Sequence, residues 1–275
     1  RFSPLLYQIQ VYFRVFCKSS LVPFFQQAHD INRRRSPLQK DSIILPIKAF
    51  LKQYPRLTRF LANYVDHFYE DYSAYKVFLQ SNRDKTYKLN LGSGADSVAD
   101  NFLNVDYSHL RGVSLRADVH HLPFLGKSID AVQCMQLIEH VKNPERMIGE
   151  IHDALKPGGE IFLTAPFMYP YHEAPIDLNR WSQEGLRSLM KEFSPIKVGV
   201  LGGPTATLVE AFHGWLSILF SFNSDKLYQT IYLLLLPFLK PLKIIDRVFL
   251  NKYSSSHRLA AMVYFYGKKR ESFSQ

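Results

Sequence analysis

The stretch that decides the fold is Leu89-Asn90-Leu91-Gly92-Ser93-Gly94-Ala95-Asp96. Its apolar first half predicts a short strand, and the Gly-x-Gly that follows predicts a tight turn. Glycine has no Cβ and tolerates positive φ, so the backbone of such a turn can approach a ligand closely. Glycine turns occur in many unrelated loops, so the meaning of this one depends on the residues that follow it.

A second apolar run, 102–105, ends at Asp106, twelve residues after Gly94. A carboxylate at the end of the next strand can accept hydrogen bonds from both hydroxyls of a ribose. Together the turn and the carboxylate predict a cofactor that contains adenosine. The pattern does not fit nicotinamide dehydrogenases, which need a third glycine where this chain has Ser97 and an acidic residue about 20 residues on.

The composition predicts a folded chain, because 47% of its 275 residues are hydrophobic. This length suits one large domain with extensions. The two cysteines, Cys17 and Cys134, have no Cys or His partner at metal-ligand spacing, so neither a disulfide framework nor a zinc site is indicated. The apolar residues of 1–20 are interrupted by polar ones, so we expect no secretory signal there.

The net charge of +10 is distributed unevenly. Residues 1–80 carry a net charge of +7 and residues 181–275 a net charge of +6, whereas residues 81–180 carry −3. Basic, aromatic-rich ends suit an anionic partner such as membrane headgroups, a phosphate-bearing substrate or nucleic acid. A basic surface that contributes only to solubility is the alternative.

Strands and helices alternate from residue 87 onward. We expect strands at 87–91, 103–106, 113–117, 129–135, 160–165, 196–201 and 260–266, and helices at 144–155 and 182–192, the second capped by Ser182. This alternation predicts an α/β fold with a doubly wound, mostly parallel sheet, in which ligands bind at the carboxyl ends of the strands.

The same pattern divides the chain into three parts. Residues 1–85 are predicted to form an N-terminal helical extension, residues 86–211 and 258–270 the ligand-binding domain, and residues 212–257 an apolar and basic helical insertion. The insertion contains nine strongly apolar residues, 231–239, too few to span a bilayer, which takes about 20. Either it packs on the core, or it lies at a membrane surface with Lys240, Lys243 and Arg247 beside the headgroups.

Six short motifs occur in one order, at 89–94, 104–106, 117–124, 128–132, 137–144 and 155–159. Each motif is common, but the ordered set resembles the class I S-adenosylmethionine-dependent methyltransferases. The resemblance covers about residues 87–200 and a last strand near 260–267. It implies a seven-stranded Rossmann-like sheet, S-adenosylmethionine as the cofactor and methyl transfer as the activity.

The resemblance also implies roles for residues at the matching positions. Gly92, Ser93 and Gly94 would hold the methionine part of the cofactor, Asp106 the ribose, Asp118 and the Val119 backbone the adenine, and Gln136 and Leu137 would line the methyl group. For the two acidic residues the alternative is a capping role at a strand end. For Glu139 and His140 both a structural role and a ligand contact stay open. A third glycine, frequent in the family, is replaced here by Asp96.

The segment 165–182 contains Pro-Phe, His172, Pro-x-Asp177 and Arg180-Trp-Ser. It resembles a loop in a bacterial subgroup often associated with cell-surface polysaccharide biosynthesis, and the resemblance places it beside the transferred methyl. His172 is then the candidate general base, oriented by Asp177, and Arg180 could grip a phosphate or carboxylate of the acceptor. The alternative is an Asp177–Arg180 salt bridge that only folds the loop. Nothing in the sequence requires a metal.

The leading hypothesis is O-methylation of a sugar or lipid-linked glycan by a cytoplasmic protein at the inner face of the membrane, with contact to an anionic membrane surface. Methylation of a small molecule such as a quinone precursor is the second hypothesis. The third, an RNA methyltransferase or nucleic-acid-binding protein, is disfavoured because no RNA-binding module is visible. A protein that binds the cofactor without turnover is a fourth. The sequence leaves the oligomeric state open.

Overall fold

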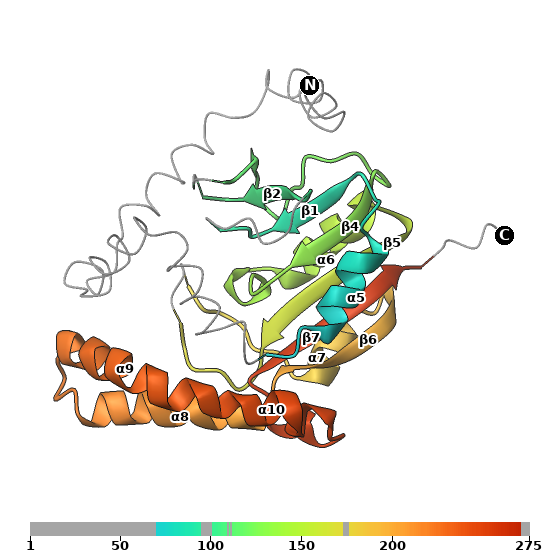
Figure 1. Cartoon of the computed structure of the whole chain (residues 1–275). Helices are drawn as coiled ribbons and strands as arrows, with labels where there is room; N and C mark the ends of the chain where they lie inside the picture. Colours follow the sequence, from blue (N-terminus) through green and yellow to red (C-terminus); the bar gives the residue numbers. More distant parts are fainter. Residues whose placement is uncertain (1–69, 95–100, 109, 111, 173–175, 271–275) are drawn as a thin grey trace. The chain divides into compact units, whose positions relative to one another are not determined.

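The computed structural model describes residues 70–94, 101–108, 110, 112–172 and 176–270 (Figure 1). Most of the extension predicted over 1–85 lies outside these residues, so its helical character stays a prediction. Contacts within the chain divide it into two compact units. The larger unit comprises Tyr69–Glu210 and Leu242–Gln275, and the smaller comprises Arg1–Phe68 and Ala211–Pro241.

Within the described residues, the larger unit contains one sheet of seven strands (Figure 1). The strands are β1 (Lys88–Leu91), β2 (Leu103–Asp106), β3 (Leu115–Arg116), β4 (Ile129–Cys134), β5 (Leu155–Pro166), β6 (Phe193–Gly202) and β7 (Met262–Lys269). Their order in the sheet is β3-β2-β1-β4-β5-β7-β6, and only β7 runs antiparallel to its neighbours. The prediction of a doubly wound, mostly parallel α/β sheet is confirmed.

The strand order reverses beside β1, which lies between β2 and β4. Ligands of open α/β sheets bind at the carboxyl ends of the strands next to such a reversal. Leu91 at the end of β1 is in register with Val105 and Cys134. The residues that follow these three positions therefore meet at one edge of the sheet, and they are the ones predicted to bind the cofactor.

Two helices of the larger unit begin where the sequence predicts but end earlier. α6 (Pro144–Ala154) starts after Asn143, whose side chain accepts from the Arg146 N–H at 3.0 Å. It was expected to include Leu155, but Leu155 pairs with Ile129 and begins β5 instead. α7 (Gln183–Leu189) starts after Ser182, whose hydroxyl accepts from Gly185 N–H at 3.1 Å as predicted, and ends three residues before the predicted 192.

Aromatic side chains of α5 (Ser73–Ser81) pack on the sheet and form the centre of the core. The rings of Tyr75 and Phe78 lie 5.1 and 5.7 Å from the ring of Phe162 on β5. The Tyr75 hydroxyl donates to Gln133 at 2.7 Å, and burial raises the pKa of Tyr75 to about 12. Phe78 is fully buried. Truncating such a ring to alanine typically costs about 3–5 kcal/mol, so α5 is part of the fold and not an appendage.

The chain between β6 and β7 is helical. It contains α8 (Pro204–Leu219), α9 (Asp225–Leu239), η4 (Lys240–Lys243), α10 (Ile244–Val248), η5 (Leu250–Lys252) and η6 (Ser256–Leu259). Within the larger unit, the Asp246 carboxylate accepts from the Thr205 and Ala206 N–H groups at 2.8 and 2.7 Å. A carboxylate at this position stabilises the start of α8, because a helix N-terminus carries partial positive charge.

Two of the lysines expected beside lipid headgroups are buried. Lys243 is 4% exposed and its ammonium lies 2.5 Å from the carboxylate of Glu210, so this part of the interfacial hypothesis is wrong. Lys240 is also buried. By contrast, α9 has no buried residue, and Leu234 and Phe238 are 65% and 76% exposed. Among the helices of the described residues, none has an apolar run long enough to cross a membrane.

Candidate functional site

The Gly-x-Gly turn after β1 has the conformation that requires glycine. Gly92 and Gly94 have φ values of +67° and +59°. The Gly92 N–H donates to the Val105 carbonyl at 2.9 Å, which ties the turn to β2. A Cβ on Gly92 would lie 2.7 Å from a methyl carbon of Leu137, whereas a Cβ on Gly94 would meet no atom of the described part of the chain within 4 Å. The turn is therefore closed on the Leu137 side and open beside Gly94, where a ligand can approach.

Asp106 lies at the open side of this turn. One carboxylate oxygen accepts from the Gly94 N–H at 2.9 Å, and the other accepts from the Ser108 N–H at 2.7 Å. A carboxylate offers about four acceptor positions, so these two bonds fix its orientation and leave acceptor capacity for hydroxyl groups. The Gly94–Asp106 contact brings together the two features from which the sequence predicted an adenosine-containing cofactor.

Asp118 follows β3, at the same edge of the sheet. One of its oxygens, Oδ1, accepts from the His120 N–H at 2.9 Å and contacts the His120 ring Nδ1 at 2.7 Å. These contacts give Asp118 the capping role that was the alternative for it. They involve only Oδ1, so the adenine contact of Asp118 and of the Val119 backbone stays a prediction.

Gln136 and Leu137 follow β4 and complete the edge. Gln136 has a φ of +50°, an uncommon conformation for a residue other than glycine, and such conformations cluster at functional sites. Its N–H donates to the Thr164 hydroxyl at 2.9 Å, and its side-chain amide donates to the Met262 sulfur at 3.3 Å. Leu137 contacts the turn at Gly92, so both residues lie where the resemblance placed them; their contact with the methyl group stays a prediction.

The loop after β5 is fixed to the 3₁₀ turn η3 (Ile138–His140) that follows β4. The Glu139 carbonyl accepts from the Leu178 and Asn179 N–H groups at 2.8 and 3.2 Å. The Asn179 side chain donates to the Val141 carbonyl at 2.9 Å, and the Trp181 N–H donates to the Pro166 carbonyl at 3.0 Å. The loop is thus held over the carboxyl ends of β4 and β5.

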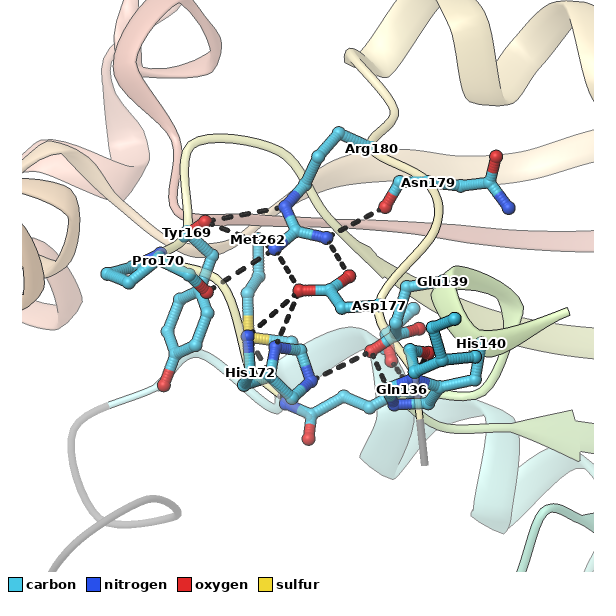
Figure 2. Close-up of polar contacts among 12 residues, drawn as sticks. Gln136, Glu139, His140, Tyr169, Pro170, His172, Asp177, Asn179, Arg180 and Met262 are labelled. Carbon is cyan, nitrogen blue, oxygen red and sulfur yellow. Dashed lines mark hydrogen bonds and ion pairs between the residues drawn. The ribbon is translucent and has the colours of Figure 1, made fainter. Parts of the chain in front are cut away.

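Asp177 and Arg180 form an ion pair inside this loop (Figure 2). The guanidinium donates to both Asp177 oxygens and to the carbonyls of Tyr169, Pro170 and Asn179. Hydrogen bonds from Arg180 lower the pKa of Asp177 to about 2. Since the N–H groups of Arg180 all point at the loop, these contacts support a role in folding the loop over a direct grip on the acceptor.

His172 lies between two carboxylates (Figure 2). Its Nδ1 is 3.4 Å from Asp177 Oδ2, and its Nε2 is 3.7 Å from Glu139 Oε1. The second distance is longer than a hydrogen bond, so we treat the Glu139 contact as an ion pair. Interaction with Glu139 is the main cause that raises the pKa of His172, and burial of the ring opposes it.

The structure thus brings the three predicted catalytic residues together, and it adds a residue that the sequence left open. Glu139 is fully buried, although it is a carboxylate, and it faces both His140 and His172. The only sequence signal was the Glu-His pair directly after a strand end. Its closeness to His172, 33 residues later, depends on how the loop folds back.

The fold and the site together define the class of the domain. A doubly wound sheet with a glycine turn after β1, a carboxylate on that turn from β2 and a polar loop over β4 and β5 is the arrangement that the class I S-adenosylmethionine-dependent methyltransferase resemblance implied. In agreement, residues 85–163 match the family model described as "Methyltransferase domain". The glycine cradle and the Asp106 carboxylate fit S-adenosylmethionine as the cofactor of this domain.

Curated relatives share short segments with the chain. A tRNA U34 carboxymethyltransferase of Campylobacter curvus is 40% identical over 50 residues, which cover 18% of this chain and 17% of the relative. A protein of Mycolicibacterium smegmatis named as a probable S-adenosylmethionine-dependent methyltransferase is 32% identical over 88 residues, 27% of this chain and 34% of the relative. A ubiquinone biosynthesis O-methyltransferase of Coxiella burnetii is 38% identical over 47 residues, 17% of this chain and 20% of the relative.

The chain therefore spans 17–34% of the length of these three relatives. Solved structures resemble it over more of its length but at low identity. Phosphoethanolamine N-methyltransferase 2 of Haemonchus contortus, in complex with S-adenosyl-L-methionine, aligns with a TM-score of 0.44 and 18% identity and covers 71% of this chain and 52% of its own. Coclaurine N-methyltransferase aligns with a TM-score of 0.43 and 14% identity, covering 70% and 71%.

Proposed function

We propose that this protein transfers the methyl group of S-adenosylmethionine to a hydroxyl oxygen of its acceptor. The observation that carries the proposal is the Gly94–Asp106 contact at the switch point of the sheet, 2.9 Å long, beside an open glycine turn. S-adenosylmethionine supplies an activated methyl group on a positively charged sulfonium. The residues of the chain have to bind the cofactor, orient the acceptor and remove the hydroxyl proton.

Binding and orientation follow from the edge of the sheet. Because Gly92 and Gly94 lack side chains, the cofactor can lie close to the protein backbone at this turn. Asp106 offers acceptors for the ribose hydroxyls. Leu137 closes the turn and Gln136 lies next to it, which sets the direction from which an acceptor can approach. Fixing two reacting groups in line can contribute about 7–11 kcal/mol to the lowering of a barrier.

The residues near His172 support transfer to oxygen in particular. A hydroxyl becomes a good nucleophile only when its proton is removed as the new bond forms. One ring nitrogen of His172 faces Glu139, and the His172 side chain is about one third exposed, so an acceptor can reach it. Asp177, held by Arg180, accepts from the His172 backbone N–H at 3.0 Å and lies 3.4 Å from the other ring nitrogen. A neutral His172 would accept the proton at Nε2.

For the acceptor we propose a sugar or lipid-linked glycan. The support is the loop 165–182 with its His172, Asp177 and Arg180 pattern. A quinone precursor is the second candidate, because the Coxiella burnetii relative is named for O-methylation in ubiquinone biosynthesis. The exposed apolar side chains of α9 suit either a lipid-linked or a hydrophobic acceptor at a membrane surface. RNA is the third class to include in the test, because the net charge is +10 and one relative is named for tRNA.

The first experiment measures cofactor binding by isothermal titration with S-adenosylmethionine. We expect one site per chain, a loss of binding in Asp106→Ala, and unchanged binding in Asp153→Asn, whose carboxylate is 85% exposed elsewhere. Thermal unfolding of both variants checks that they fold. A folded wild-type protein that does not bind the cofactor would refute the proposal.

The second experiment identifies the acceptor. The protein is incubated with S-adenosylmethionine that carries a labelled methyl and with extracts separated into glycolipid, quinone and RNA fractions. We expect label in the glycolipid fraction. Label confined to the quinone fraction would replace the first acceptor class with the second, and label confined to RNA would overturn both.

A further inference from the structure

Three side chains from two segments of the chain meet in the loop region after β4 and β5 (Figure 2). They are the Glu139 carboxylate and the His140 ring from η3 and the His172 ring from the loop after β5. One ligand atom from each lies within 4.8 Å of the other two. Of the residues that the structure describes, this is the cluster whose donor set and spacing suit a metal ion.

Glu139 is the unusual member of the cluster. It is fully buried, and neither of its carboxylate oxygens has a hydrogen-bond partner among the residues that the structure describes. Burying a carboxylate without partners costs several kcal/mol, so a buried carboxylate normally acquires a partner or a bound cation. Its two nearest charged or chargeable neighbours, His140 and His172, are too far for hydrogen bonds, at 3.9 and 3.7 Å.

The two histidines are oriented as metal-bound histidines are. Nδ1 of His140 lies 2.6 Å from the Ile176 carbonyl, so this nitrogen donates to the carbonyl, and Nε2 faces Glu139. Nδ1 of His172 faces Asp177, and its Nε2 also faces Glu139. Metal-binding histidines typically donate their other ring N–H to a backbone carbonyl or a carboxylate. His140 makes such a contact with the Ile176 carbonyl, whereas Nδ1 of His172 lies 3.4 Å from Asp177 Oδ2 without a hydrogen bond.

The spacing also fits a shared ion. Two ligands bound tetrahedrally at about 2.0–2.1 Å from zinc are about 3.3 Å apart. The Glu139–His172 and Glu139–His140 distances of 3.7 and 3.9 Å exceed this by a few tenths of an ångström, which small side-chain rotations can close. Two imidazoles and one carboxylate are the ligand set of catalytic sites that keep an open coordination position.

We propose that Glu139, His140 and His172 bind a divalent transition-metal ion of the Zn²⁺ or Mn²⁺ type. The open position faces the His172 side, because His172 is the most exposed of the three. With the ion bound, Nε2 of His172 is a ligand and no longer the base, and an acceptor hydroxyl at the open position would lose its proton to solvent more easily, since a bound cation stabilises the oxyanion. In the transfer, the bond from the methyl carbon to sulfur breaks and a bond to the acceptor oxygen forms, so the sulfonium becomes a neutral thioether. This acceptor role rests on the proposed function, whereas metal binding itself does not.

Metal binding is tested on tag-free protein stripped with EDTA and titrated with Zn²⁺ and, separately, Mn²⁺. We expect one ion per chain and a rise in unfolding temperature on addition of the ion. His172→Ala and Glu139→Gln should weaken binding at least tenfold, consistent with the loss seen when even supporting residues of metal sites are changed. His257→Gln removes an exposed histidine elsewhere and should bind like the wild type. Equal ion binding in all four proteins, or none in any, would overturn the proposal.

Glu139→Gln also separates a metal site from a simple buried ion pair. If no cation binds, Zn²⁺ leaves the unfolding temperature of the wild type and of the variant equally unchanged. If the site binds metal, the variant loses the rise in unfolding temperature that Zn²⁺ gives the wild type. His172→Ala lies in the loop and provides the same comparison should Glu139→Gln fail to fold.

The acceptor role is tested by measuring methyl transfer in EDTA and after adding Zn²⁺ or Mn²⁺. We expect at least a tenfold loss in EDTA that the ion reverses, while S-adenosylmethionine binding stays unchanged. Undiminished transfer in EDTA would overturn the acceptor role of the ion and leave the proposed function intact. Ion binding without cofactor binding would refute the proposed function and leave the metal site intact.

Discussion

Replacing Gly92 with alanine tests how the cofactor turn is shaped, and Gly94→Ala is its matched control. Both glycines have positive φ, at +67° and +59°, so either alanine incurs a left-handed backbone cost of about 1–2 kcal/mol. Only Gly92→Ala adds a clash, because its Cβ would lie 2.7 Å from a Leu137 methyl carbon. Overpacking typically adds about 1–3 kcal/mol. We therefore expect Gly92→Ala to destabilise the protein by about 2–5 kcal/mol and Gly94→Ala by about 1–2 kcal/mol.

Chemical denaturation measures these two losses, and titration with S-adenosylmethionine measures their effect on the site. For S-adenosylmethionine binding the order of the two variants should be reversed, and Gly94→Ala should weaken binding more than Gly92→Ala. The reason is that the Gly94 Cβ would point into the space where the cofactor is expected. Adding Leu137→Ala should recover part of the Gly92→Ala loss, because it removes the clashing methyl group. Equal destabilisation by the two alanines, or no coupling between positions 92 and 137, would refute this account of the turn.

Three further predictions concern the loop and the surface. The pKa of Asp177 is lowered to about 2, so its pairing with Arg180 should stabilise the folded protein by roughly 2 kcal/mol at neutral pH. This stabilisation should be lost as the pH falls from about 4 to about 2. Arg180→Gln should not show this loss of stability in acid unfolding, and an unchanged acid profile would contradict the pairing. His172→Ala should keep S-adenosylmethionine binding and lose at least tenfold in turnover, typical of losing an acid–base group; retained turnover, measured by methyl transfer, would remove His172 from the mechanism. Phe238→Ser should reduce flotation with anionic liposomes, while Val77→Ser, which changes an exposed apolar residue on α5, should not. Equal flotation of both variants would argue against α9 as a membrane contact.

The sheet was predictable from the sequence because its signals are local. Apolar runs, turn glycines and capping residues such as Ser182 are visible within a few positions, and their order specifies the doubly wound sheet. The start of β5 was not predictable in this way. Leu155 continues the apolar periodicity of α6, but its pairing with Ile129 on β4 makes it a strand residue. Propensity is a weak signal wherever a long-range pairing competes with it.

The cofactor residues were predictable for the same reason, since each lies directly after a strand. The environments of Lys243 and Glu139 were not predictable from the local sequence. Lys243 follows an apolar run, a pattern that suits a membrane surface, yet it pairs with Glu210, 33 residues earlier. Glu139 was visible only as a polar residue beside a histidine. Its burial and its position facing His172 depend on a loop that folds back over η3, and no local pattern encodes that contact.

The charges around His172 explain why the cluster needs a cation and how the nature of that cation can be determined. Asp177 is paired with Arg180, whereas neither oxygen of the buried Glu139 carboxylate has a hydrogen-bond partner among the described residues, so this carboxylate needs a positive charge nearby. A proton on His172 or a metal ion can supply the missing positive charge, and the two respond oppositely to pH.

The pKa of His172 is raised in the folded protein, so a proton there stabilises fully below the unfolded value of about 6.5, and this stabilisation is lost as the pH rises through the folded value. Metal binding needs deprotonated imidazoles, so stabilisation by Zn²⁺ grows over the same range. We therefore expect the unfolding temperature in EDTA to fall relative to His172→Ala as the pH rises above about 6.5, while the rise caused by Zn²⁺ increases. A Zn²⁺ effect that shrinks as the pH rises would show that the proton, and not a metal ion, compensates Glu139.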